Sequence, residues 1–484
     1  MLVGSEAIVI IISYIACLLL LCLAVSRLKM KTSDDYILGG RRMSLLLVAL
    51  SLSADNIGGA STAGLAGYAY STGSASALWY VFACALAMIP LSLLAPRIRR
   101  TLAVTIPEVI ERRFGRSSAY FTAGLNLISS LCLISSQISA SGIVIHAVTG
   151  INLRLAMVIT AAVICFYTVI GGMIADQLTD AIQYVVIIFG LAIAVPYVIR
   201  GCGGWEKVTS TLPEDYGDIT KAGWVTIIGS VLNYFCTFVT GPEMVSRFSS
   251  AKDEKTASLA SLLSGLLMAA VVAFPTVLGL CAHSVSTRLG SPEPDNVLIA
   301  VTQQYAPGVV AGILASAIIA AAMSTADSHL LCLAAIAVKD IYIPLRKTSP
   351  DEKTIIRETK ILMVIFSALA LAIAIFNFRI LEVNTFAFAL RSAGPFASYG
   401  LGLVVKKATR HSGQISLITG TAAVIIWQLL SGEGFYLGII PSVFGAAVGV
   451  LTFFIVNAIE WKKGISPAPD AYSVTVFRDH KADE

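Results

Sequence analysis

Residues 317–331 read Ala317-Ile-Ile-Ala-Ala-Ala-Met-Ser-Thr-Ala-Asp-Ser-His-Leu-Leu331 and place hydroxyls and a carboxylate inside a run that is otherwise apolar enough to cross a bilayer. An unsatisfied polar group in hydrocarbon costs several kcal/mol, so such side chains face a cavity, an ion or a partner helix. A stripe of hydroxyls can replace the water around a small cation, or the hydroxyls can bond back to carbonyls of their own helix. Helical spacings of three and four place one stripe at Ala321, Ser324, Thr325 and Ser328.

The composition of the whole chain indicates an all-α integral membrane protein. Hydrophobic residues make up 56% of the 484 residues and charged residues only 13%, which leaves too little polar surface for a soluble globule. Apolar runs of roughly 18 residues or more mark transmembrane helices. They predict one polytopic membrane domain over residues 1–484, with about thirteen helices at 5–26, 43–70, 76–96, 118–146, 155–175, 180–199, 222–246, 258–283, 308–338, 360–377, 380–405, 413–431 and 436–459.

The distribution of Lys and Arg predicts the orientation in the cell membrane. Basic residues concentrate on the cytoplasmic side of membrane proteins, and an odd number of helices separates the two termini. We therefore expect the N-terminus outside and a cytoplasmic tail at 460–484. The net charge of +5 is explained by anionic lipid headgroups and indicates no nucleic acid. Most of the 34 basic residues fall in 27–42, 97–117, 247–257, 339–360, 406–412 and 460–484.

Several chemistries have no support in the sequence. The nine cysteines form no Cys-x-x-Cys pair, and most lie in apolar runs, so they are expected to be buried hydrophobic residues rather than disulfides or metal ligands. There is no His-Glu-x-x-His motif and no phosphate-binding loop. We therefore expect neither an enzyme nor an ATP-driven pump, and transport would be driven by an ion gradient or be passive.

Two apolar runs are interrupted at corresponding places. In the run 43–70, Asp55 and Asn56 precede two glycines, and in the run 222–246, Gly241 precedes Pro242. Such residues loosen a helix and free its carbonyls, although a small-residue packing face explains the first run equally well. Paired interruptions are typical of an inverted-repeat transporter with its site at the membrane midplane. We expect five-helix repeats at 43–199 and 222–405, with peripheral helices in 406–459.

Four segments, in this order, resemble the solute:sodium symporter family. They are Ser53-Ala54-Asp55, Gly171 to Gln183, Arg247 to Lys255, and Ala-Ala-Met-Ser324-Thr325. The resemblance is closer to the proline and pantothenate carriers than to the sugar carriers. It implies a LeuT-like fold with an inverted 5+5 helix repeat.

The resemblance also implies a set of sodium ligands between the second and ninth helices. Carbonyl and hydroxyl dipoles suit a hard cation that prefers several oxygens. Asp180 matches a carboxylate on the sodium path of the family, and a helix N-cap formed with Thr179 is the alternative. The implied ligands of Na+ are the carbonyls of Ala49, Leu52 and Ala321 and the hydroxyls of Ser324 and Thr325.

The solute site is expected beside the interrupted helices. Ile138 stands where the proline carriers have a tyrosine, which argues against proline itself. The sugar contacts of the galactose carrier have no counterpart, which argues against a sugar. Arg391 lies about 18 Å into its helix at 1.5 Å per residue, near mid-membrane. It must pair with a solute anion or with Asp327, Asp55 or Glu243, while His329 is expected to be a packing residue. The resemblance to the proline carriers implies an aromatic solute pocket at Tyr234, Phe238 and Pro242. The other candidate solute-binding residues are Ser53, Asp55, Asn56 and Arg391.

The function predicted from these observations is a sodium-coupled symporter that imports a small organic solute, an amino acid or a carboxylate, by alternating access. Its partners would be the solute, sodium and the lipid bilayer, with no obligatory protein partner. A proton-coupled carrier, in which Asp327 or Asp180 titrates, and a sodium-permeable channel are the alternatives. A receptor is disfavoured because residues 460–484 are too few for an output domain.

Overall fold

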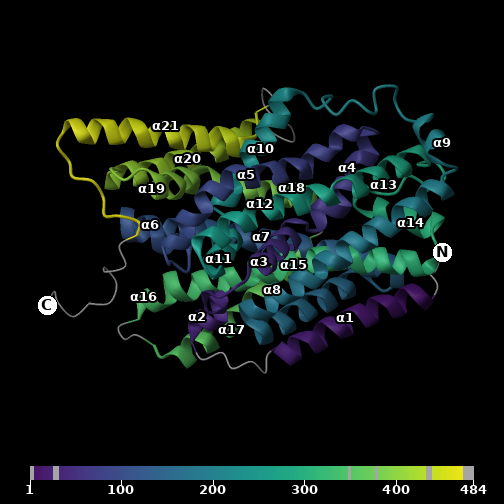
Figure 1. The fold of residues 1–484 in the computed structure, drawn as a ribbon, viewed down its shortest axis with the longest axis horizontal. Helices are drawn as coiled ribbons and strands as arrows, with labels where there is room; N and C mark the ends of the chain where they lie inside the picture. Colours follow the sequence, from purple (N-terminus) through teal and green to yellow (C-terminus); the bar gives the residue numbers. More distant parts are fainter. Residues whose placement is uncertain (1–4, 26–31, 347–349, 377–379, 432–438, 473–484) are drawn as a thin grey trace.

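The computed structural model describes residues 5–25, 32–346, 350–376, 380–431 and 439–472. Every secondary-structure element named in this part of the chain is a helix, apart from an isolated bridge between Met43 and Ala251. The long helices run roughly along one axis of the molecule (Figure 1). Of the predicted helices, residues 26, 377 and 436–438 lie outside the described residues, as does most of the predicted tail, 473–484.

The first part of the chain contains one of the two bent helix pairs. The chain bends by 61° between α3 and α4. The bounds are α1 (Ser5–Val25), α2 (Ser33–Leu38), η1 (Gly39–Arg41), α3 (Leu45–Asn56), η2 (Ala60–Gly64), α4 (Leu65–Thr72), η3 (Ala75–Leu78), α5 (Trp79–Arg100), α6 (Ile106–Phe114), α7 (Arg116–Thr149), α8 (Leu153–Gly201) and α9 (Trp205–Thr209).

The second part contains the other interrupted helix, which bends by 60° between α10 and α11. Its bounds are α10 (Trp224–Val239), α11 (Pro242–Ser250), α12 (Glu254–Val271), α13 (Ala273–Ser284), η4 (Pro294–Asn296), α14 (Val297–Tyr305), α15 (Gly308–Ile336), η5 (Ala337–Tyr342), α16 (Ile343–Leu345), α17 (Glu352–Ala374), α18 (Ile380–Pro395), η6 (Phe396–Gly400), α19 (Leu401–Val404), α20 (Arg410–Ser431) and α21 (Pro441–Lys462).

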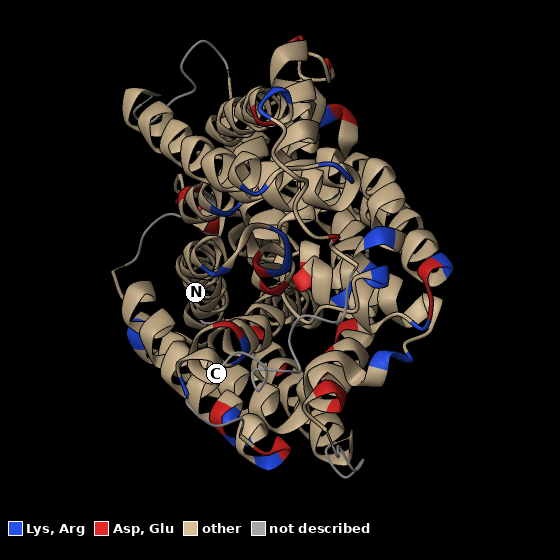
Figure 2. Cartoon of the chain, turned by 90° about the vertical axis from the view of Figure 1, so that its left-hand side faces the viewer, with Lys and Arg blue, Asp and Glu red and all other residues tan. Residues whose placement is uncertain are grey.

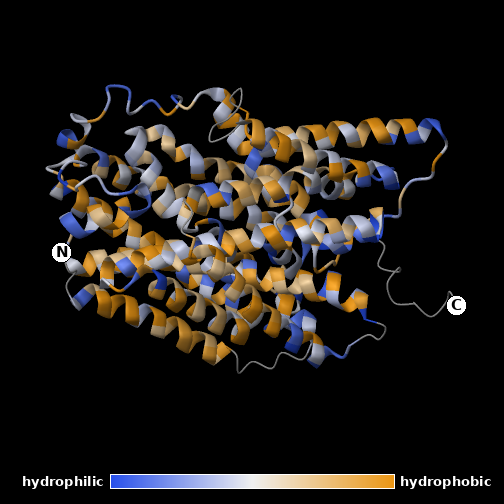
Figure 3. Ribbon diagram, turned by 180° about the vertical axis from the view of Figure 1, so that it is seen from behind, coloured by the Kyte–Doolittle hydropathy of each residue, from blue (hydrophilic) through white to orange (hydrophobic). Residues whose placement is uncertain are grey.

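Length and hydropathy mark eight membrane-spanning helices among the described residues, or ten if each bent pair is one span. Hydrophobic residues predominate along the middle of the molecule, and hydrophilic ones gather toward the two ends of the long axis (Figure 3). The eight helices are Ser5–Val25, Ala75–Arg100, Arg116–Thr149, Leu153–Gly201, Glu254–Ser284, Gly308–Leu345, Arg410–Leu430 and Pro441–Lys462.

Both predicted interruptions are present, and glycines explain the first. A Cβ on Gly58 would lie 2.7 Å from Thr325 Oγ1, and a Cβ on Gly59 would lie 2.6 Å from the Cβ of Ala140. The glycines therefore let α15 and α7 approach the break. The packing explanation and the broken-helix explanation of this segment hold together.

Helix α15 lies at the centre of the bundle, with α7 and α8 beside it and α20 and α21 at the periphery (Figure 1). Nearly every residue from Val310 to Ile336 is buried. A helix that is apolar all round must be enclosed by other helices, so its few polar side chains can only meet protein groups or ions.

The segment α8 has 49 residues and consists of two helices that meet at a kink at Gly172, where φ is 57° and ψ is −168°. The predicted gap at 176–179 is wrong, because the helix resumes directly after this glycine. Thr179 donates its hydroxyl to the carbonyls of Ala175 and Asp176, both at 2.9 Å. Asp180 is therefore inside a helix, and the N-cap alternative for it is wrong.

Replacing Gly172 with Ala should lower the free energy of unfolding by about 1–3 kcal/mol. The backbone at this position has a positive φ, and the added Cβ would lie 2.8 Å from the carbonyl oxygen of Tyr36. The melting temperature in detergent measures this loss. Gly204→Ala is the matched control, because that glycine also has a positive φ but has no atom within 4 Å of the added Cβ. Equal losses in the two variants would show that the contact with Tyr36 does not matter.

Candidate functional site

The hydroxyls of Ser324 and Thr325 connect α15 to the end of α3. Ser324 Oγ lies 3.0 Å from the carbonyl oxygens of Ala54 and Ala321. Thr325 Oγ1 lies 2.7 Å from the carbonyl oxygen of Asp55 and 3.2 Å from that of Ala321. These carbonyls are available because α3 ends at Asn56. The break and the hydroxyl stripe thus meet in one buried, oxygen-rich place.

The other two expected sodium ligands lie on the same helix but make different contacts. The carbonyl of Ala49 accepts from Ser53 Oγ at 2.7 Å, and that of Leu52 accepts from Asn56 Nδ2 at 2.6 Å. The described hydroxyls contact α3 at Ala54 and Asp55, further along the helix than Ala49 and Leu52. The expected sodium ligands are all neutral carbonyl or hydroxyl oxygens, which fits Na+. No group of three or more His, Cys, Asp or Glu suited to a metal ion occurs among the described residues.

Arg247 lies in a fully buried ionic cluster between α3, α8, α11 and α15. Its Nη2 is 2.7 Å from Asp180 Oδ2, 3.3 Å from Asp176 Oδ2 and 3.8 Å from Asp55 Oδ1. Its Nε donates to Ser51 Oγ at 2.7 Å, and Nη2 also donates to Ser328 Oγ.

Three carboxylates around one guanidinium leave an excess of negative charge that is hidden from water. Buried charge of one sign attracts a cation or a proton. Ser328 links this cluster to the hydroxyl stripe, because its Oγ lies 3.2 Å from Asp176 Oδ1 and donates to the carbonyl of Ser324 at 2.8 Å. The guanidinium of Arg247 and the hydroxyl of Ser328 therefore link Asp180 to the carbonyl of Ser324.

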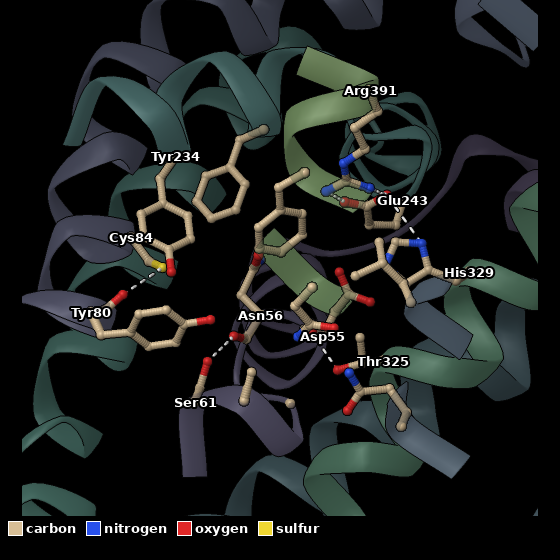
Figure 4. Close-up of a pocket in the computed structure, with 17 residues that line it drawn as sticks. Asp55, Asn56, Ser61, Tyr80, Cys84, Tyr234, Glu243, Thr325, His329 and Arg391 are labelled. Atoms are coloured by element: carbon tan, nitrogen blue, oxygen red, sulfur yellow. Dashed lines mark hydrogen bonds and ion pairs between the residues drawn. The ribbon is translucent and has the colours of Figure 1, made fainter. Parts of the chain in front are cut away.

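A cavity lies beside this stripe, and Figure 4 shows aromatic rings on one side of it and charged groups on the other. The ring of Tyr234 lies 6.1 Å from that of Tyr80 and 5.7 Å from that of Phe238, measured between centroids. Residues 234 and 238 are four apart, so they share one face of α10. The aromatic lining is Tyr80, Tyr234, Phe238 and Phe388, and the polar and charged lining includes Asp55, Asn56, Gln137, Glu243, Thr325, His329, Asn384 and Arg391.

Two expected solute-binding residues do not line this cavity. Ser53 is turned toward α12, where its Oγ lies 3.0 Å from Ser264 Oγ. Pro242, the first residue of α11, lines a smaller apolar cavity with Ser246 and Cys332. Both residues lie within two positions of one that does line the larger cavity, and sequence proximity could not show which side of the helix each one occupies.

The mid-membrane arginine has a protein partner. Arg391 Nη1 and Nη2 donate to the two carboxylate oxygens of Glu243 at 2.9 and 2.8 Å. His329 Nδ1 lies 3.5 Å from Glu243 Oε2, so this histidine contacts the ion pair as well as packing in the helix bundle. Of the three carboxylates considered from the sequence, Glu243 is the partner.

Several residues of the site were missed by the sequence reasoning. Gln137 accepts from the backbone N–H of Gly59 at 2.8 Å and so holds the break in place. Tyr80 and Asn384 come from α5 and α18, and no spacing pattern connects them to the interrupted helices. The available signal for Gln137 and Asn384 was a lone amide in an apolar run, which is costly to bury without a partner.

Comparison with known proteins identifies the class. Residues 36–420 match the model of the sodium:solute symporter family, and the chain belongs to that family. It is similar to the high-affinity proline transporter PutP of Bacillus subtilis (28% identity over 467 residues, 92% of this chain and 96% of that protein). It is also similar to the sodium/proline symporter of Escherichia coli (26% identity, 88% of each chain).

Solved structures support the fold. A sodium-coupled sialic acid symporter in its substrate-bound outward-open state has a TM-score of 0.84 at 20% identity and covers 96% of this chain and 98% of its own. The nucleobase-cation-symport transporter Mhp1 in a closed conformation has a TM-score of 0.60 at 13% identity, with 90% and 97% covered. The protein is thus a multi-pass membrane transporter with a LeuT-like helical fold. It is a sodium-coupled symporter for a small organic solute and not an enzyme.

Replacing Arg247 with Gln should destabilise the protein by about 3–5 kcal/mol, because the aspartates are left with no buried counter-charge. The melting temperature and the yield of monodisperse protein measure this effect. Arg100→Gln is the control, because it removes an exposed ion pair with Glu254 and should cost about 1 kcal/mol or less. Similar losses in both variants would argue against a special role for the buried cluster.

Proposed function

We propose that this symporter imports a small amino acid or carboxylate, bound in the cavity of Figure 4, together with sodium bound between α3 and α15. One observation carries the proposal. Thr325 lines the cavity, and its hydroxyl also bonds to the carbonyl of Asp55, itself a lining residue. An ion at this contact and a solute in the cavity would therefore share two residues, which gives a direct route for coupling their binding.

The proposed sodium ligands are the carbonyls of Ala49, Leu52 and Ala321 and the hydroxyls of Ser324 and Thr325. The contacts of Ser324 and Thr325 with α3 support this assignment, since a small shift of either helix changes which carbonyls are in reach. Asp180 belongs to the proposed path of the ion. Its position in the Arg247 cluster supports this role, because the excess of carboxylates attracts a cation toward the stripe.

The proposed solute site combines Asp55, Asn56, Tyr234, Phe238 and Arg391 in the cavity wall. The aromatic rings suit a compact, partly apolar solute, and the polar side suits its charged or hydrogen-bonding groups. Ser53 and Pro242 would act from outside the wall, by holding α3 and α11 in place. The names of the relatives make proline the first solute to test.

The proposed architecture has about thirteen transmembrane helices in one domain. Repeats at 43–199 and 222–405 would form the transporting core, with peripheral helices in 406–459. The similar bends of 61° and 60°, one in each repeat, support this division. The break at Gly172, which divides α8 into two parts, and the helices α17 and α18 support the higher helix count.

The proposed orientation has the N-terminus outside and the tail 460–484 in the cytoplasm. Helix α1 begins at one end of the long axis and α21 ends at the other (Figure 1). The second end also carries α2 and α6, and Figure 2 shows Lys and Arg residues on it. Basic residues are favoured on the cytoplasmic side.

Sodium binding would hold α3 against α15 and favour the form that accepts the solute. For a neutral solute, one sodium gains about 2.3 kcal/mol per 100 mV of membrane potential. A tenfold sodium gradient adds roughly 1.4 kcal/mol. Together they support an accumulation of several hundred fold.

A proton-coupled carrier is the second candidate, and one observation favours it. Asp327 is fully buried beside the Arg247 cluster, where Ser328 donates its backbone N–H to Asp327 Oδ1 at 2.8 Å. A carboxylate in that setting could exchange a proton. Uptake into vesicles driven by a pH gradient in sodium-free buffer would support this candidate over sodium coupling.

Thr325→Val should raise the sodium concentration needed for half-maximal uptake by about tenfold, because it keeps the volume but removes a hydroxyl ligand. Sodium titration of uptake in vesicles measures this shift. Ser316→Ala is the control, since this buried serine lies nine residues before Thr325 and so on the opposite side of α15. An unchanged sodium requirement in Thr325→Val would argue against the assigned site.

The solute should raise the melting temperature of the purified protein in sodium but not in potassium, because a ligand that binds the native state stabilises it in proportion to its affinity. Proline, other amino acids and small carboxylates form the panel. Equal shifts in the two salts would contradict sodium coupling. A response to sugars instead would contradict the proposed class of solute.

A further inference from the structure

The ion pair between Glu243 and Arg391 joins two separate walls of the cavity. Glu243 lies in the first turn of α11, directly after the break, and Arg391 lies on α18. Both side chains are almost completely buried, with 2% and 1% exposed. The guanidinium also lies 5.1 Å from the ring centroid of Phe388, another wall residue. The pair therefore fixes the second half of the broken helix against α18 (Figure 4).

A further acidic group of the wall, Asp55, has its partner outside the cavity. Asp55 lies 3.8 Å from Arg247, which belongs to the buried cluster behind it. The remaining polar groups of the wall include hydroxyls, the imidazole of His329 and the neutral amides of Asn56, Gln137 and Asn384. The positive charge of the wall is thus matched by the protein itself, whereas Asp55 shares Arg247 with two other carboxylates.

A solute with a net negative charge would meet no uncompensated positive charge in this wall. A lone carboxylate would have to compete with Glu243 for Arg391, and so would leave a buried carboxylate without its partner. Breaking one side of a buried ion pair is strongly unfavourable. A zwitterion or a neutral solute avoids this cost, because its own charges sum to zero.

We propose that Glu243 and Arg391 form a specificity-determining pair, which makes the cavity exclude a solute with a net negative charge and positions α11 against α18. This inference rests on the proposed solute site and narrows it, since it favours a neutral amino acid over a carboxylate anion. Arg391 is then a positioning residue that acts through Glu243. It is not the group that binds the carboxylate of the solute.

The first test uses no solute. In sodium, the single variants Glu243→Gln and Arg391→Gln should each lower the melting temperature, because each leaves one buried charge unpaired. The double variant Glu243→Gln/Arg391→Gln should recover most of the loss, because two amides can hydrogen-bond to each other. Asp215→Asn/Lys221→Gln, which removes an exposed pair, should behave like the unmodified protein. A double variant as unstable as the sum of the single variants would overturn the pairing.

The second test measures the charge of the preferred solute. Three probes share a five-membered ring: L-proline is a zwitterion, cyclopentanecarboxylate is an anion and pyrrolidine is a cation. The unmodified protein should bind L-proline but not the anion in a sodium-dependent thermal shift. Glu243→Gln should gain the anion, Arg391→Gln should gain the cation, and each should bind L-proline about tenfold more weakly or worse. The double variant should bind L-proline within about tenfold of the unmodified protein.

The outcomes separate the inference from the proposed function. Loss of L-proline binding in the double variant as complete as in Arg391→Gln would mean that Arg391 contacts the solute directly, and would overturn the inference. Binding of the anion by the unmodified protein would overturn it too. If the unmodified protein responds to none of the three probes, the proposed solute class fails. The first test still decides whether Glu243 and Arg391 act as a pair.

Discussion

The guanidinium of Arg247 is the constraint on which the rest of the site depends. It is fully buried, and within 4 Å it meets carboxylates from α3 and α8 as well as the hydroxyl of Ser328 on α15. A charge in this position is tolerable only if its partners are held in place. The cluster therefore fixes the position of α11 relative to three other helices. It thereby determines where the two broken helices face each other.

The breaks in α3 and α10 do more than bend the chain. A helix that ends inside the protein leaves carbonyls without helical partners. At the end of α3 these carbonyls accept from Ser324 and Thr325, and Gln137 accepts from the backbone of Gly59 on the other side of the break. Groups that would be costly in lipid thus become the polar lining of the proposed ion site and of the cavity beside it. The sharing of Thr325 and Asp55 between the two is what the proposed coupling requires.

The electrostatics of the site fit the energetics of transport. A solute of zero net charge leaves the charge of the cotransported sodium uncompensated, so the membrane potential contributes to uptake. With an anionic solute and one sodium this contribution would vanish. The internal pairing of Glu243 with Arg391 favours the first case, because it leaves the cavity wall without an unmatched positive charge.

The amino-acid sequence by itself determined the membrane setting, the places of most helices, the two interruptions and the hydroxyl stripe. These features depend on local composition and on helical periodicity, which are read along one segment at a time. The family resemblance added Asp180 and the sodium ligands. The break within α8 was misplaced by a few residues, because the polar run 176–180 imitates a loop when its buried partners are unknown.

Only the tertiary structure decided which groups pair across the molecule. The partner of Arg391 lies 148 residues away, and three candidate carboxylates were equally consistent with the sequence. Helix rotation directs Ser53 away from the cavity and brings Tyr80 and Gln137 into it. The pairing of distant residues depends on the rotation and packing of whole helices, and local sequence patterns do not encode it.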